Sequence, residues 1–253
     1  MKGSDATWKL WGNEVTMMRL KIQNPPGNVD VSDRVVSGDS WDGYPTERNE
    51  LMAYLKSQGI QNVVVLSGDI HASFAGTLMD DFDGATPQPV ACELVGPGIS
   101  SNSLFSFFEA ATRGGNPAQR GLITVDASAV GGGTFIENFN LLLLDGVISA
   151  GTFAGAIAQG APQAVALSAA LAKADPNTNP HLKWADTNSQ GYGYVQVTAA
   201  QVAATIVTIN RPIATPTDAG PGVKRTASFT IPKDNPAGMT GPSVTGTKPF
   251  PLT

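Results

Sequence analysis

Short apolar runs in the first hundred residues predict the strands of a buried sheet. In residues 62–66 the apolar side chains follow one another without polar alternation, which is typical of a strand covered on both faces. The runs ASFAGTL (72–78) and PVACELV (89–95) are further strand candidates. Residues 7–23 are rich in apolar and aromatic side chains and predict one or two extended segments.

A helix is predicted for 46–57, where the start and stop signals agree. Pro45 suits the first helical turn, an apolar stripe runs through the segment, and Gly59 is a typical C-terminal stop. Two further helices are expected, a short one at 103–111 and an alanine-rich one at 164–173. Strands therefore mix with helices along the chain, and the sequence predicts an α/β (α+β) fold.

The remaining segments carry weaker signals. Residues 112–160 have a weak, glycine-rich pattern, with a loop expected at 131–133. Two strands are expected at 193–197 and 203–209. From 214 onward the chain is rich in Pro, Gly and Thr.

This composition suggests a division of the chain into two parts. We expect a domain over 1–212 and a tail over 213–253, which is coil except for one possible strand at 227–231.

Composition and charge exclude several classes of protein. The 253 residues suffice for a real core, and the formal net charge of −5 argues against nucleic acid or an anionic membrane as the main partner. The single cysteine, Cys92, excludes an intrachain disulfide and a thiolate zinc cluster, and its apolar run favours burial in a strand. No stretch reaches the roughly 18 apolar residues of a membrane span, and the first residues contain no signal peptide.

Asp69 and His71 are the first candidates for chemistry, because they follow the predicted strand 62–66 directly. Ligands of open α/β sheets bind beyond the carboxyl ends of the strands. If the chain stays extended after Gly68, the two side chains point the same way. A carboxylate and an imidazole placed so can bind a metal, or act as a base and the group that orients it. Alternatively, Asp69 caps a turn and His71 is a half-buried structural histidine.

The segment GDSWDGYPTER (38–48) is the second candidate. Asp39 and Asp42 offer carboxylates to a metal, and Arg48 offers a guanidinium to a phosphate oxygen. Trp41 and Tyr44 are candidates for substrate contacts. The alternatives are that Asp42 fixes a turn, that the two aromatic side chains anchor the packing, and that Arg48 is a solvated helix residue.

Five blocks of sequence resemble one known family in order and in spacing. They are WKLWGNEV (8–15), DSWDGYPTER (39–48), NVVVLSGDIHASFAG (62–76), PVACELVGPGISS (89–101) and NPHLKWADTNSQGYGYVQVT (179–198). These blocks are similar to the alkaline phosphatase D (PhoD-like) family of metallophosphoesterases, and they extend over roughly the first 200 residues.

The resemblance implies a fold, an activity and a set of metal ligands. The fold would be a calcineurin-like metallophosphoesterase β-sandwich flanked by helices, and the activity would be metal-dependent hydrolysis of phosphate mono- and diesters. Asp69 and His71 would bind metal, with Asp39 and His181 as further candidates. The metals would be iron and calcium, or other divalent ions. They would polarise a phosphoryl oxygen and supply a hydroxide for in-line attack.

The resemblance covers only about the C-terminal half of the family's domain. A cysteine, an aspartate, a tyrosine beside an arginine and an asparagine bind metal in the family's upstream half, and they have no counterpart before Asp39. We therefore expect a phosphoric ester hydrolase that needs a complementary N-terminal half or a homodimer partner. The alternatives are a non-catalytic remnant and a metal- or phosphate-binding α/β module. By resemblance alone the setting would be periplasmic or extracellular.

Overall fold

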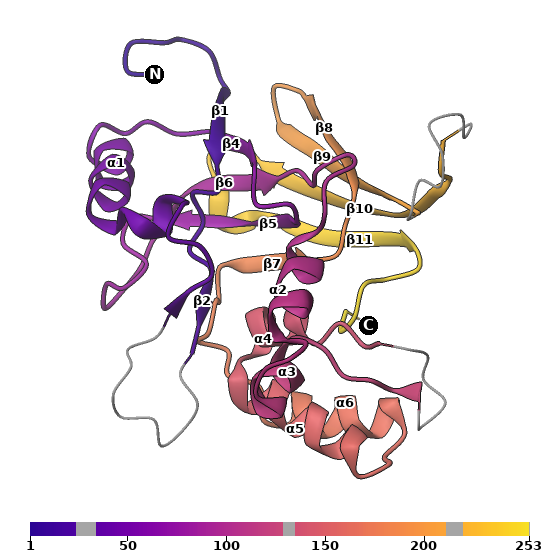
Figure 1. The fold of residues 1–253 in the computed structure, drawn as a ribbon. Coiled ribbons are helices and arrows are strands. Elements are labelled where there is room, and N and C mark those ends of the chain that lie inside the picture. The colour runs from indigo at the N-terminus through magenta and orange to yellow at the C-terminus, as the bar shows by residue number, and fades with distance from the viewer. Residues whose placement is uncertain (24–33, 129–134, 211–219, 253) are drawn as a thin grey trace.

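The computed structural model describes residues 1–23, 34–128, 135–210 and 220–252 (Figure 1). It contains two stacked β-sheets, with α1 on one side and a group of helices at one end. The predicted loop at 131–133 lies outside the described residues.

The first sheet has five strands in the order β1-β4-β6-β5-β7. Its strands are β1 (Lys9–Val15), β4 (Val63–Gly68), β6 (Pro89–Val95), β5 (Ser73–Met79) and β7 (Leu182–Asp186). The neighbours β1, β4 and β6 run parallel, whereas β5 is antiparallel to both β6 and β7. The carboxyl ends of three adjacent strands therefore meet at one edge of the sheet.

The second sheet is antiparallel and has the order β11-β10-β9-β8. It is formed by β8 (Gly191–Val197), β9 (Gln201–Ile209), β10 (Val223–Pro232) and β11 (Thr240–Gly246). A separate pair joins β2 (Lys21–Ile22) to β3 (Arg34–Val35).

The helix α1 lies beside the sheets, and the other α-helices form a separate group at one end of the molecule (Figure 1). The 3₁₀ helix η1 (Trp41–Gly43) leads into α1 (Pro45–Ser57), and η3 (Pro236–Gly238) precedes β11. The helical group comprises α2 (Leu104–Thr112), α3 (Pro117–Ile123), α4 (Phe139–Asp145), α5 (Val147–Ala158) and α6 (Gln163–Leu171) (Figure 1).

Both faces of the first sheet are buried, which explains the uninterrupted apolar strands. Val63 and Val65 of β4 face the core that contains Met52 of α1, and Val64 faces the core shared with the second sheet. Such alternation follows from the period of two in a strand. Cys92 is fully buried on the second of these faces, as its apolar run predicts.

Residues 16–20 connect β1 to β2 through the core on the α1 side. Glu93, fully buried in the middle of β6, accepts hydrogen bonds from the backbone N–H groups of Met17 (2.8 Å) and Met18 (2.5 Å). Its carboxylate also accepts one from the Ser67 hydroxyl (2.6 Å). Burial raises the pKa of Glu93 to about 7, in spite of these hydrogen bonds.

Most predicted elements are confirmed, and the expectation of a mostly coiled tail is wrong. The helix at 46–57 and the strands at 62–66, 72–78 and 89–95 match α1, β4, β5 and β6. Residues 112–160, where the sequence pattern is weak, contain three helices, α3, α4 and α5. The tail is not mostly coil: β10 pairs with β9 along its length and β11 pairs with β10, so both complete the second sheet.

None of the helices in the described ranges combines the length and the apolar character that crossing a bilayer requires.

Candidate functional site

The carboxyl edge of the first sheet positions the candidate site. Val15, the last residue of β1, pairs with Gly68, the last residue of β4. On the other side of β4, Ser67 pairs with Val95, and the Gly96 N–H donates to the Ser67 carbonyl (2.9 Å). The segments that come after these three strands therefore lie side by side.

Asp69 and His71 occupy this edge in an uncommon backbone conformation. Their φ angles are +65° and +57°, in the left-handed region that non-glycine residues seldom adopt. Between them, the buried Ile70 donates its N–H to the Gly68 carbonyl (2.8 Å) and anchors the turn in the core. The expectation of an extended chain after Gly68 is wrong, because the chain turns at each of the two candidate residues.

The turn leaves both side chains exposed beyond the strand end. His71 Nδ1 lies 2.8 Å from the backbone carbonyl of Asn102, and the His71 carbonyl accepts the Leu104 N–H (2.9 Å). Because a carbonyl only accepts hydrogen bonds, Nδ1 is the donor in this contact, and Nε2 is left for another partner. An imidazole oriented in this way is suited to binding a metal ion or accepting a proton. The half-buried structural role is wrong for His71, since its ring is exposed.

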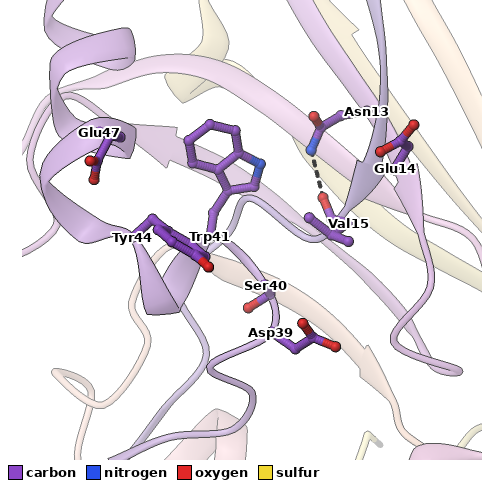
Figure 2. A pocket seen from close by; sticks show the side chains of 8 residues that line it. All are labelled: Asn13, Glu14, Val15, Asp39, Ser40, Trp41, Tyr44 and Glu47. Carbon is purple, nitrogen blue, oxygen red and sulfur yellow. Dashed lines mark hydrogen bonds between the residues drawn. The ribbon is translucent and has the colours of Figure 1, made fainter.

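A pocket of about 350 Å³ opens between the end of β1 and the start of α1 (Figure 2). Its lining residues come from β1, from η1 and the residues beside it, and from α1: Asn13, Glu14, Val15, Asp39, Ser40, Trp41, Tyr44 and Glu47. The Trp41 indole lies in the middle, between Tyr44 and Glu47 on one side and Asn13 on the other (Figure 2). Three predicted site residues, Asp39, Trp41 and Tyr44, therefore share one pocket.

Local hydrogen bonds fix the wall of this pocket. The Ser40 side chain caps η1 by accepting the Asp42 N–H (3.4 Å), and the Trp41 N–H donates to the Thr16 carbonyl (3.1 Å). On the strand side, the Asn13 amide donates to the Val15 carbonyl (2.6 Å; Figure 2). Pro45 then starts α1.

Arg48 and Asp42 face the interior instead of the pocket. The Arg48 side chain is 2% exposed, forms an ion pair with Asp42 and donates to the Met17 carbonyl (3.2 Å). The other Asp42 oxygen accepts the Leu20 N–H (2.8 Å). Burial raises the pKa of Asp42, although the Arg48 charge opposes this shift. Arg48 is therefore no solvated helix residue, and its role as a phosphate ligand stays a prediction.

His181 lies apart from Asp69 and His71. His181 comes directly before β7, whereas Asp186 is the last residue of β7. Asp186 pairs with Ser73, which lies next to the turn of Asp69 and His71. Five β7 residues at about 3.3 Å each separate the two ends. His181 Nε2 donates to the Arg19 carbonyl (2.7 Å), and burial lowers the pKa of His181 to about 3.

The donors that the described residues assemble do not complete a metal site. Asp69, His71 and Asp39 have the right chemistry for iron or calcium, namely carboxylate oxygens and an imidazole nitrogen. In the parts of the chain that the structure describes, however, no three His, Cys, Asp or Glu side chains are grouped closely enough to hold a metal ion. Within the described residues, the chain alone therefore does not supply enough metal ligands to hold an ion.

Comparisons with known proteins agree with the resemblance in the sequence. Residues 1–125 match the family model described as PhoD-like phosphatase. Alkaline phosphatase D of Bacillus subtilis (strain 168) is 45% identical over 67 residues, which are 26% of this chain and 12% of that protein. These matches support assigning the chain to the PhoD-like family.

A solved structure titled "Structure of PhoD" supports the fold. It matches 98% of this chain with a TM-score of 0.55 and 22% identity, and the matched part is 34% of that chain. The fold is thus of the metallophosphoesterase type, as the PhoD-like blocks predict. The chain spans about a third of that structure and about an eighth of the Bacillus protein.

Sequence reasoning missed five residues of the pocket, namely Asn13, Glu14, Val15, Ser40 and Glu47. Asn13 and Glu14 lie within β1 near its carboxyl end, beside the end of β4 that Asp69 follows. Nearness to the carboxyl end of a strand is the sequence signal that could have identified these two residues. Glu47 was interpreted only as part of the helix.

Proposed function

We propose that the chain forms part of a phosphoester-hydrolysing site in which Asp69 and His71 are the central residues. The observation that carries this proposal is their exposed, left-handed turn at the carboxyl edge of the parallel strands. Backbone conformations that cost energy cluster at functional sites. Family membership supports phosphoester hydrolysis as the general activity.

In this proposal the reaction replaces an ester P–O bond by a bond to the oxygen of water. His71 Nε2 would face the reacting groups, since Nδ1 is held by the Asn102 carbonyl. Asp69 would contribute a carboxylate, and Asp39 a second one from the neighbouring pocket. Iron and calcium, or other divalent ions, are the cofactors that the family resemblance suggests. The remaining donors would come from a complementary N-terminal half or from a second copy of the chain.

The experiment measures metal content and hydrolysis together. The purified chain, supplied with a complementary N-terminal half, is incubated with iron and calcium, analysed by mass spectrometry, and assayed on an aryl phosphate and a bis-aryl phosphate with and without a chelator. We expect bound metal and turnover that the chelator removes. Turnover that survives complete metal removal would contradict metal dependence, and bound metal without any turnover would contradict hydrolysis.

The incomplete donor set among the described residues favours one alternative, a non-catalytic metal- or phosphate-binding module. Binding of metal or phosphate at Asp69 and His71 with no turnover, even when an N-terminal half is supplied, would support it.

A further inference from the structure

The imidazole of His71 is held by a segment outside its own turn. Its Nδ1 donates to the backbone carbonyl of Asn102 (2.8 Å), and the His71 carbonyl accepts the Leu104 N–H (2.9 Å). Asn102 belongs to the connection between β6 and α2, residues 96–103, and Leu104 begins α2. The direction of the ring therefore depends on where this β6–α2 connection lies.

The β6–α2 connection contains no helix or strand, and a second connection runs along it. This is the β7–β8 connection, residues 187–190, which passes from the first sheet to the second. Four hydrogen bonds join the two connections and the residues next to them: Gly191 N–H to the Gly98 carbonyl (3.1 Å), Gln190 Nε2 to the Ser101 carbonyl (2.6 Å), the Ser103 hydroxyl to Asn188 Oδ1 (2.6 Å) and Phe105 N–H to the Thr187 carbonyl (2.8 Å). The residue numbers rise along one segment while they fall along the other, so the two segments lie antiparallel.

The β7–β8 connection is itself fixed to the body of the protein. The Thr187 N–H and hydroxyl both donate to Asn140 Oδ1 in α4 (3.0 and 2.7 Å), and the Gln190 carbonyl accepts the Ile209 N–H of β9 (2.8 Å). Thr187 is fully buried, and Gln190 is 4% exposed. A buried segment with anchors on both sides can hold an exposed loop in one position.

Two of the four contacts flank Asn102 directly. Gln190 holds Ser101, the residue before Asn102, and Asn188 holds Ser103, the residue after it. Asn102 itself is exposed, so the position of its carbonyl depends on these two neighbours. A side-chain hydrogen bond on each side thus holds the carbonyl that the imidazole contacts.

We propose that Asn188 and Gln190 are positioning residues for His71, which fix the direction of its Nε2 through the Asn102 carbonyl. The inference rests on the proposed function, in which Nε2 faces the reacting groups. A hydrogen bond at one nitrogen of an imidazole decides what the other nitrogen can do. Side chains behind the first ligands orient histidines in metal sites, and their loss commonly costs about 10–100-fold in metal affinity or activity.

A purely structural role makes a different prediction. Buried backbone carbonyls need hydrogen-bond partners wherever they lie, and Gln190 would then stabilise the fold without affecting the imidazole. A positioning role also determines the tautomer of the neutral ring, because a carbonyl at Nδ1 favours the tautomer with its proton on Nδ1. The ¹⁵N signals of the two ring nitrogens distinguish these roles.

The test records ¹⁵N NMR spectra of the metal-free chain with labelled histidine at about pH 8.5. The chain contains two histidines, and the signals of His71 are those that His71→Ala removes. We expect the Nδ1–H tautomer in the unmodified chain. Gln190→Met keeps the length of the side chain but removes the donor, and it should lower the ratio of Nδ1–H to Nε2–H roughly threefold to tenfold. Gln196→Ala, at an exposed glutamine of β8, is the control and should leave the ratio unchanged.

Asn188→Ala is the second variant, and its half-buried position makes it the deciding one if circular dichroism shows that Gln190→Met does not fold. It should lower the same ratio, because it releases Ser103 from the β7–β8 connection. An Nε2–H tautomer in the unmodified chain, or an unchanged ratio in every folded variant, would overturn the inference.

The NMR measurement needs neither metal nor turnover, so its failure is separable from that of the proposed function. Hydrolysis by the chain with its complementary N-terminal half, together with an unchanged tautomer in the variants, removes the positioning role alone. A changed tautomer without hydrolysis of any phosphoester keeps the orientation of the ring by Gln190 and removes the proposed function. Where both hold, Gln190→Met should lower metal affinity about tenfold and should have no further effect in a His71→Ala background.

Discussion

Val15 and Gly68 form the last residue pair between β1 and β4, and both strands end at this pair. The exposed turn of Asp69 and His71 comes directly after β4, and the end of β1 lines the pocket around Trp41. Two segments separated by more than fifty residues in the sequence thus form one candidate site. A parallel strand pair produces this arrangement directly, because its carboxyl ends lie at the same edge.

The left-handed turn predicts an unusual response to glycine. Asp69→Gly should raise the free energy of unfolding by up to about 1 kcal/mol, because glycine adopts a φ of +65° without steric cost. Asp69→Val should lower it by about 1–2 kcal/mol. Chemical denaturation measures both. As a control, Glu50→Gly inside α1 should be destabilising by about 1 kcal/mol. Destabilisation by Asp69→Gly of the same size as the control would contradict a strained turn.

Glu93 predicts a specific dependence of stability on pH. Its pKa rises from the ordinary value of 4.5 to about 7 in the folded chain, so the folded state holds more protons than the unfolded state between these values. The contribution of Glu93 to stability is therefore present below pH 4.5 and is lost as the pH rises to about 7.

The measurement compares wild type with Glu93→Gln by urea denaturation between pH 4.5 and 8. The free energy of unfolding of wild type should fall, relative to the variant, by on the order of a few kcal/mol across this range. Glu50→Gln serves as the exposed control and should show no such difference. Parallel pH curves for wild type and Glu93→Gln would show that Glu93 is ionised in the fold at neutral pH.

The buried ion pair predicts that Arg48 is needed for stability. Arg48→Met leaves the Asp42 carboxylate buried without its partner and should lower the free energy of unfolding by about 3–5 kcal/mol. The double variant Asp42→Asn with Arg48→Met should recover part of that loss, as thermal denaturation would show. Normal stability of Arg48→Met together with a raised KM for phosphoesters would instead support Arg48 as a substrate ligand.

His181 should be a neutral structural histidine. Since burial lowers its pKa to about 3, the ring should not titrate between pH 5 and 8 in NMR spectra. His181→Ala should lower the free energy of unfolding by about 2–4 kcal/mol, through the lost hydrogen bond to the Arg19 carbonyl and the cavity left beside Phe82. Metal content should be unchanged. Loss of metal with normal stability would support His181 as a ligand.

The local elements of the first sheet were predictable because their signals lie within a few residues. The apolar run of β4 and the Pro45 to Gly59 limits of α1 depend on short-range rules. The strand β11 was missed because its sequence, TGPSVTG, is poor in apolar residues, and it exists through pairing with β10.

The candidate site was only partly predictable, for a similar reason. Asp69, His71, Asp39, Trp41 and Tyr44 stood out in two short motifs, but the pairing that joins the motifs is tertiary. The burial of Arg48 also depends on a distant segment, since Met17 supplies the carbonyl that its guanidinium contacts. Neither the register of β1 on β4 nor the path of residues 16–20 is encoded in a local pattern.

The most direct test of the account is the Asp69→Asn variant, because asparagine also adopts the left-handed conformation and removes only the charge. His71→Ala is the companion variant, and Asp5→Asn, an exposed residue before the start of β1, is the control. Bound metal and aryl phosphate hydrolysis are measured on each chain together with a complementary N-terminal half, with circular dichroism as the check on folding. We predict that Asp69→Asn and His71→Ala lose both metal and turnover while Asp5→Asn retains them. Unchanged metal content and turnover in both site variants would contradict the assignment of Asp69 and His71 as the centre of the site.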